Sequence, residues 1–167
     1  AERKPVMAQI ALVSSHAPWT PLPKLVPWGD VGDGRIFDTA REGATPEELW
    51  AEPEQVRAQY GRAISYDLAT LESFVLTHAT DKTVLIILGD HQPMSFISGD
   101  DAPRDVPVHF ITKDAAVANA VAGWSWTEGM RPNTQSPTWK MDALRGRIVA
   151  TFSAGAPAYS FTGSGDL

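Results

Sequence analysis

The stretch TVLIILGDHQP (Thr83–Pro93) joins a run of aliphatic residues to a glycine, an acid and an imidazole. Consecutive aliphatic residues rich in valine and isoleucine are typical of a strand that is covered on both faces, as in a parallel sheet. In open α/β sheets, functional residues gather where the strands end. Asp90 and His91 stand at such a place. We therefore expect an α/β domain with a functional site at this corner.

Composition limits the class of protein. The chain has 167 residues, of which 43% are hydrophobic, and this is enough for one folded domain with a buried core. Its formal net charge of -6 argues against a nucleic-acid partner, because binding to phosphates needs a basic surface. The absence of cysteine excludes disulfides, thiolate metal sites and a cysteine nucleophile. No apolar run approaches the roughly 20 residues that cross a bilayer.

The pattern before Thr83 predicts one strand, one long loop and a long helix. Apolar residues alternate from Val6 to Val13, which favours a strand that ends at Ser14, Ser15 and His16. Residues 20–44 are rich in proline and glycine and should form an irregular excursion. Thr45 with Pro46 and Glu48 forms a capping box. From Pro53 to about His78, a period of three to four predicts a helix; its buried stripe is Val56, Tyr60, Ile64, Leu68, Leu71 and Val75.

The pattern after Pro93 predicts a further strand and two helices. Residues 106–111 form the strand, and Asp114 caps a short alanine-rich helix. Residues 124–138 form an ordered loop, and a last helix carries Met141, Leu144, Ile148 and Phe152 on one face. The tail 153–167 is rich in Gly, Ser, Ala and Pro, and we expect it to be mobile.

The Asp90-His91 pair is the best candidate for chemistry. A carboxylate oxygen and a neutral imidazole nitrogen suit zinc or manganese. The alternative is a helix N-cap aspartate followed by a partly buried histidine. Because zinc takes three or four ligands, a complete site needs others. His16 also follows a predicted strand and is a candidate to reach the same sheet edge; the alternative is a loop histidine bonded to Ser14 or Ser15.

Other polar residues favour structural roles. His109 alternates with Val108 and Phe110, as a satisfied sheet histidine does, and His78 falls at a helix end, where a cation is favoured. The acids Asp100, Asp101 and Asp105 lack the spacing of a calcium loop and predict a solvated loop. Sequence motifs of serine hydrolases, P-loops, zinc proteases and dinucleotide-binding proteins do not occur.

Three segments together resemble a known family. They are Ser15-His16-Ala17-Pro18-Trp19, the helix 60–75 with Tyr66-Asp67 in its middle, and the strand that runs into Gly89-Asp90-His91. They look like the carboxy-terminal half of an alkaline phosphatase and sulfatase superfamily domain. The nearest members of that family are membrane-anchored sulfatase-like hydrolases and transferases of phosphoethanolamine or phosphoglycerol. The resemblance implies a three-layer α/β sandwich with a mostly parallel sheet, of which residues 1–167 are a partial domain.

The resemblance also implies a chemistry. Asp90 and His91 would bind a divalent metal, usually zinc, manganese or calcium, and His16 would contact the phosphate or sulfate of an ester substrate, such as a lipid headgroup of the cell envelope. The parent protein would be anchored in a membrane, with this part on the extracytoplasmic face or in the periplasm. Members of the family carry the nucleophile and an acidic metal ligand in their amino-terminal half, and no segment here matches it. Leu12 replaces the acid of an Asp-x-x-x-His pair, which argues against two-metal chemistry. We therefore expect the nucleophile to lie upstream of Ala1 and this fragment to be inactive alone.

Two other hypotheses remain open. The chain is alternatively a non-catalytic envelope domain that binds a glycan or a protein partner through loops around Trp19, Trp28, Trp124 and Trp126. The third hypothesis is self-association of the fragment, because a sheet cut in half leaves an open edge.

Overall fold

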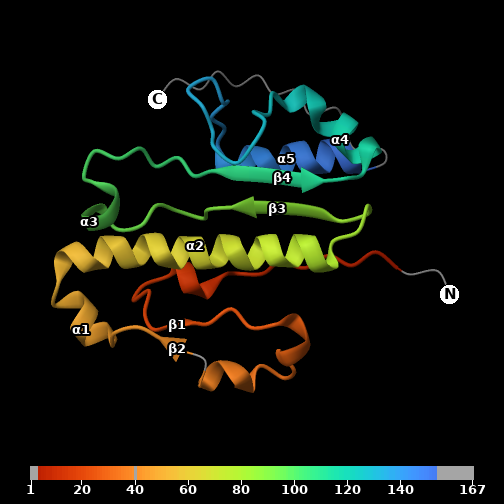
Figure 1. The fold of residues 1–167 in the computed structure, drawn as a ribbon. Helices are drawn as coiled ribbons and strands as arrows, with labels where there is room; N and C mark the ends of the chain where they lie inside the picture. The colour runs from red at the N-terminus through yellow and green to blue at the C-terminus, as the bar shows by residue number, and fades with distance from the viewer. Residues whose placement is uncertain (1–3, 40, 154–167) are drawn as a thin grey trace. The chain divides into compact units, whose positions relative to one another are not determined.

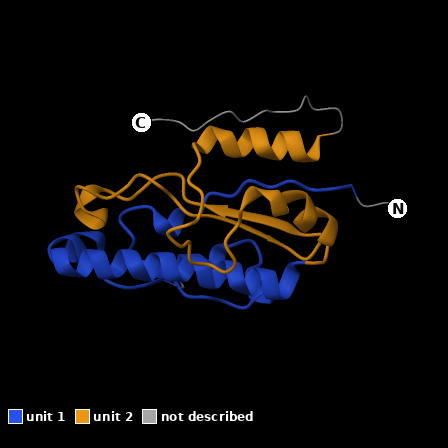
Figure 2. Ribbon diagram, turned by 90° about the horizontal axis from the view of Figure 1, so that it is seen from above, with its two compact units in different colours: residues 1–79 blue, residues 80–167 orange. Residues whose placement is uncertain are grey.

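The structure is a computed structural model that describes residues 4–39 and 41–153. The chain divides into two compact units, residues 1–79 and residues 80–167, which Figure 2 shows in blue and orange. Each unit is described by itself. No helix in the described part is long and apolar enough to span a membrane. Of the predicted mobile tail 153–167, all but Ser153 lies outside the described residues.

Two helices form the frame of unit 1: α1 (Pro46–Trp50) and α2 (Pro53–His78) (Figure 1). The predicted capping box is confirmed at the start of α1. Thr45 Oγ1 accepts a hydrogen bond from the Glu48 backbone N–H at 3.3 Å, and Glu48 Oε2 accepts one from the Thr45 N–H at 2.9 Å. These bonds satisfy two backbone donors that the first helical turn leaves free.

The buried face of α2 differs from the predicted stripe. Val56 is buried as expected, but the other buried residues are Gln59, Ala63 and Asp67, while Leu68 is exposed. The two polar side chains are tolerated because they hydrogen-bond to the loop that follows the amino-terminal segment. Trp19 and Leu49 complete the core of this unit.

The excursion over residues 20–44 is irregular, as predicted. It contains two 3₁₀ turns, η2 (Trp28–Asp30) and η3 (Arg35–Asp38), and ends where β1 (Leu22–Pro23) pairs antiparallel with β2 (Arg41–Glu42). Gly43 has a φ of +124°, and a Cβ placed on it would lie 2.9 Å from Thr20 Oγ1. The same hydroxyl donates to Ala44 O at 2.7 Å, so the two ends of the excursion meet at this glycine.

The prediction of a strand over Val6–Val13 is wrong. Residues 4–12 form neither helix nor strand, and Val13–Ser15 is a 3₁₀ turn, η1. Alternation alone does not make a strand, because its backbone groups need a partner strand. The two sheets of the described residues are β1–β2 and β3–β4, and neither includes this segment. Val6, Met7 and Ile10 are consequently 91%, 95% and 77% exposed.

Unit 2 is built on the hairpin of β3 (Val84–Leu88) and β4 (Val108–Thr112), joined by residues 89–107 with the short helix α3 (Ser95–Ser98). Two helices follow β4, α4 (Ala115–Val121) and α5 (Met141–Phe152), with the 3₁₀ turn η4 (Ala122–Trp124) between them. The predicted strand at 84–88 and the last helix are confirmed. The core consists of Val121, Trp124 and Leu144, and these pack with Val108, Phe110, Trp126, Trp139 and Ile148.

The predicted fold class is wrong. β3 and β4 run antiparallel, with Val84 opposite Thr112 and Leu88 opposite Val108, and the described residues contain two small antiparallel sheets and no mostly parallel sheet. The chain is therefore not a three-layer α/β sandwich. A parallel pair requires a crossover that returns the chain to the same end of the sheet, usually through a long helix. Residues 89–107 contain four helical residues, and the chain instead comes back directly beside β3.

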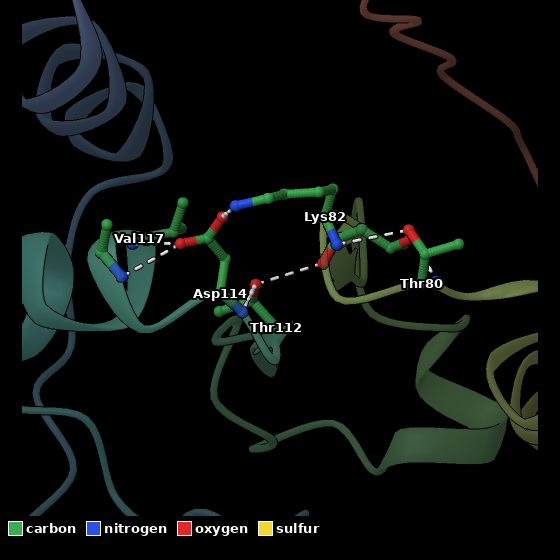
Figure 3. A network of polar contacts seen from close by, with 7 residues as sticks. Thr80, Lys82, Thr112, Asp114 and Val117 are labelled. Atoms are coloured by element: carbon green, nitrogen blue, oxygen red, sulfur yellow. Dashed lines mark hydrogen bonds and ion pairs between the residues drawn. The ribbon is translucent and has the colours of Figure 1, made fainter.

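Polar contacts fasten the two ends of this hairpin to the start of α4 (Figure 3). The Asp114 carboxylate caps α4 by accepting from the N–H groups of Ala116 at 3.0 Å and Val117 at 3.4 Å, and it pairs with Lys82 Nζ at 2.8 Å. Thr112 Oγ1 donates to Thr83 O at 3.1 Å. The predicted cap at Asp114 is thus confirmed, and the ion pair with Lys82 lowers the pKa of its carboxyl group.

Candidate functional site

The Asp90-His91 corner begins where β3 ends. The Gly89 N–H donates to Pro107 O at 3.2 Å, which continues the ladder one residue beyond β3. A Cβ on Gly89 would lie 3.1 Å from Val106 Cβ, so glycine allows the returning chain to approach closely. The side chain of Gln92 donates to Asp105 O on the same returning segment. The corner is therefore anchored on both sides of its two candidate ligands.

The side chains of Asp90 and His91 face each other in solvent. Asp90 Oδ1 accepts from the His91 backbone N–H at 2.9 Å, while Oδ2 lies 3.8 Å from His91 Nε2. His91 Nδ1 is 2.7 Å from Gln92 O. A carbonyl oxygen only accepts, so in the neutral imidazole Nδ1 carries the proton and Nε2 keeps its lone pair. Asp90 Oδ2 and His91 Nε2 thus each keep a lone pair, and the two atoms lie 3.8 Å apart.

This geometry fits half of a metal site. Ligand distances to zinc are about 2.0–2.2 Å for imidazole nitrogen and carboxylate oxygen, so one cation can bridge the 3.8 Å between Asp90 Oδ2 and His91 Nε2. Hydrogen bonds that fix the far side of each ligand are typical of metal sites. Within the part of the chain that the structure describes, no group of three or more His, Cys, Asp or Glu residues is placed to hold a metal.

The N-cap alternative for Asp90 is wrong. The next helix, α3, begins at Ser95 and has Met94 at its N-cap position. Asp90 Oδ1 instead accepts from the residue that follows it, and His91 is exposed rather than partly buried.

His16 lies in unit 1, directly after η1, and is exposed. Its Nδ1 is 2.8 Å from Ala17 O, so the hydrogen-bond partner is Ala17 rather than Ser14 or Ser15. Asp90 and His91 belong to unit 2. Each unit thus has one corner with an exposed imidazole whose Nδ1 faces the backbone carbonyl of the next residue.

Sequence reasoning missed the role of Asp67, which is 7% exposed on the buried face of α2. Burial raises the pKa of this carboxyl group, and hydrogen bonds from Ser15 and Ser14 act in the opposite direction. Oδ2 has no hydrogen-bond partner among the described residues. The sequence offered little signal, because α2 also carries Glu54 and Glu72 and the partners of Asp67 lie about 50 positions earlier in the chain.

The raised pKa of Asp67 predicts a stability that depends on pH. Between the ordinary pKa of 3.8 and the raised value, the folded unit holds a proton that the unfolded chain has lost, so stability falls as the pH rises through this window. In Asp67→Asn this contribution is absent. The unfolding free energy of Asp67→Asn minus that of the wild type should therefore increase with pH in this window. Below the window, this difference should not change with pH.

Urea unfolding at a series of pH values, followed by amide exchange in α2, measures this difference. Asp67→Leu is the matched control, because any neutral side chain should give the same pH trend whatever its absolute stability. A difference that decreases with pH, or that differs in trend between the two variants, would contradict the assignment.

The other polar residues considered in the sequence are His109, His78 and the three acids of the loop after β3. His109 Nε2 lies 2.9 Å from Met130 O, while Nδ1 is buried without a hydrogen-bond partner among the described residues. The ring of His78 packs edge-on against Trp28 at 4.8 Å. Asp100, Asp101 and Asp105 are exposed, as the prediction of a solvated loop requires.

The tryptophans divide into core and surface residues. Trp19 and Trp124 are buried, and Trp28 is 37% exposed with its Nε1–H on Ser73 Oγ at 2.9 Å. In unit 2, Trp126 and Trp139 line a cavity of about 770 Å³ between the start of β4 and the start of α5. The alternative hypothesis named loops around Trp19, Trp28, Trp124 and Trp126, and of these Trp28 and Trp126 are not buried.

Comparison of the chain with protein-family models, with curated proteins and with solved structures finds no match.

Proposed function

We propose that this chain contributes a metal half-site to a hydrolase or transferase that acts on phosphate or sulfate esters, with lipid headgroups of the cell envelope as one candidate substrate. The observation that carries the proposal is the pair of atoms Asp90 Oδ2 and His91 Nε2, 3.8 Å apart, exposed and each fixed from behind by a backbone group. The resemblance of the surrounding segments to sulfatase-like enzymes supports the same chemistry.

In this proposal Asp90 and His91 hold the cation, which supplies Lewis-acid polarisation of an ester oxygen when bound. Asp90 orders the pair through the His91 N–H, and Gln92 O keeps His91 in the tautomer that can ligate. The resemblance assigns His16, which lies in unit 1, a contact with the anionic group of an ester substrate. No motif in this sequence supplies the remaining metal ligands or the nucleophile. In this proposal, other residues provide them.

Titration with Mn²⁺ tests the half-site without an activity assay. Two ligands hold a cation weakly, so the readout is paramagnetic broadening of imidazole NMR signals at millimolar Mn²⁺. We expect the signals of His91 to broaden before those of His78. Removing an outer-shell partner of a metal ligand costs about 10–100-fold in affinity, and Asp90→Asn removes the charge of a ligand, so a loss of at least about tenfold is expected.

Asp101→Asn is the matched control, because it makes the same charge change at an exposed acid of the same connection between β3 and β4. Its affinity for Mn²⁺ should equal that of the wild type. Equal losses in both variants would mean diffuse attraction of a cation to an acidic surface, and the half-site would be refuted. For the substrate class, inorganic phosphate followed by ³¹P NMR should bind more tightly in the presence of Mn²⁺, and only when Asp90 is intact.

A further inference from the structure

The corner that carries His16 is held by side chains of unit 1. Gln59 Nε2, on the buried face of α2, donates to Trp19 O at 2.9 Å. Trp19 Nε1 donates in turn to Ser15 O at 2.8 Å. These two bonds in series connect the helix to the residue that precedes His16.

The backbone of this corner is strained, and its surroundings fix it. Trp19 has a φ of 63°, a value that is a genuine outlier for a bulky side chain. Such a conformation persists only where neighbouring groups determine it, and it is found most often at functional sites. Here the indole of Trp19 stacks on Trp50 at 5.6 Å and meets the edge of Tyr60 at 5.4 Å.

Asp67 holds the other side of the same corner. Its carboxylate, buried on α2 about two turns beyond Gln59, receives hydrogen bonds from Ser14 and Ser15, the two residues before His16. The Ser15 hydroxyl has two acceptors in reach, Leu12 O at 2.9 Å and Asp67, and can donate its single proton to one of them. When the Ser15 hydroxyl turns to Leu12 O, the Asp67 carboxylate keeps two donors, the Ser14 hydroxyl and the Ser15 backbone N–H.

The geometry points to Asp67 as a positioning residue for His16. By holding Ser14 and Ser15, it keeps the imidazole where Nδ1–H donates to Ala17 O at 2.8 Å and Nε2 is left open to solvent. An Nε2 held in this way accepts a proton, and as part of an imidazolium it donates to an anionic oxygen. What His16 does for a substrate rests on the proposed function, whereas its positioning by Asp67 needs no metal and no substrate.

The test is the tautomer of the neutral His16 imidazole, read from its ¹⁵N chemical shifts. In the wild type, Nδ1–H should predominate. In Asp67→Leu, which has a similar shape and no acceptor, this preference should be lost and the two tautomers should exchange. Asp67→Asn keeps an acceptor oxygen and should restore the wild-type preference. His78, at the other end of α2, is the internal control and should not change.

An unchanged His16 tautomer in folded Asp67→Leu would overturn the proposal, as would the same loss in Asp67→Leu and Asp67→Asn. If Asp67→Leu does not fold, Ser14→Ala decides: it removes a donor from a half-buried side chain and should weaken the preference in the same direction. Failure of the Mn²⁺ titration at Asp90 and His91 would leave this readout untouched, so the two proposals fail separately.

Discussion

Replacing Trp124 by alanine is expected to lower the free energy of unfolding of unit 2 by about 3–5 kcal/mol, the range measured when buried aromatic side chains are removed. Trp124 is 7% exposed and stands at the centre of an aromatic cluster, 5.9 Å from both Trp126 and Trp139 and 6.5 Å from Phe110. No other side chain of that size is buried in this unit's described core, so a void is left behind.

Urea unfolding followed by amide exchange in α4 and α5 measures this loss. Trp126→Ala is the matched control, because it deletes the same atoms from a half-buried neighbour in the same cluster. Its loss should be clearly smaller. Equal losses in the two variants would show that Trp124 does not organise the core of unit 2.

Trp19→Ala is expected to have an effect of similar size in unit 1, about 3–5 kcal/mol. The side chain is 4% exposed, and its indole joins α1 to α2 through Trp50 and Tyr60. The substitution also removes the Nε1–H that bonds Ser15 O. We therefore expect the His16 corner to lose its order together with the stability of the unit.

Amide exchange in α2 and the NMR signals of His16 measure these two effects. Trp28→Ala, in the same unit but 37% exposed, is the control and should leave the His16 signals in place. A stable Trp19→Ala variant with an unchanged His16 spectrum would refute the view that this indole supports the corner.

The elements that sequence reasoning predicted correctly are those whose contacts are local. The capping box joins Thr45 and Glu48 across three positions, and the cap at Asp114 bonds Ala116 and Val117. The bounds of helix α2, Pro53 to His78, agree with the prediction. In each case the physical cause lies within a few residues of the effect, so a window of sequence contains it.

The errors concern partners that are distant along the chain. Alternation at Val6–Val13 is the same whether or not a second strand is present, and the aliphatic run at 84–88 does not record the direction of its neighbour. The buried face of α2 was displaced by one residue because Gln59 bonds a carbonyl 40 positions away. From sequence alone, a polar residue is expected to be exposed, because the hydrogen-bond partner that would allow its burial is not known.

For the candidate site, the sequence could show only that the two candidate metal ligands are adjacent in the chain. Asp90 and His91 were expected to lie together because they are neighbours, and the structure adds that Asp90 Oδ2 and His91 Nε2 lie 3.8 Å apart. The resemblance named His16, but the means of holding it could not be read in advance, since Asp67 acts across the fold on Ser14 and Ser15.

Gly43 has a consequence for natural variation in this chain. A side chain there would be forced into a left-handed backbone conformation and would also displace the Thr20 hydroxyl from Ala44 O. Relatives that keep this excursion should therefore carry glycine at position 43 and a hydroxyl residue at position 20, and should lose both together when the loop is shortened. The side chain of Ala44, which follows the glycine and is exposed, should vary freely among such relatives.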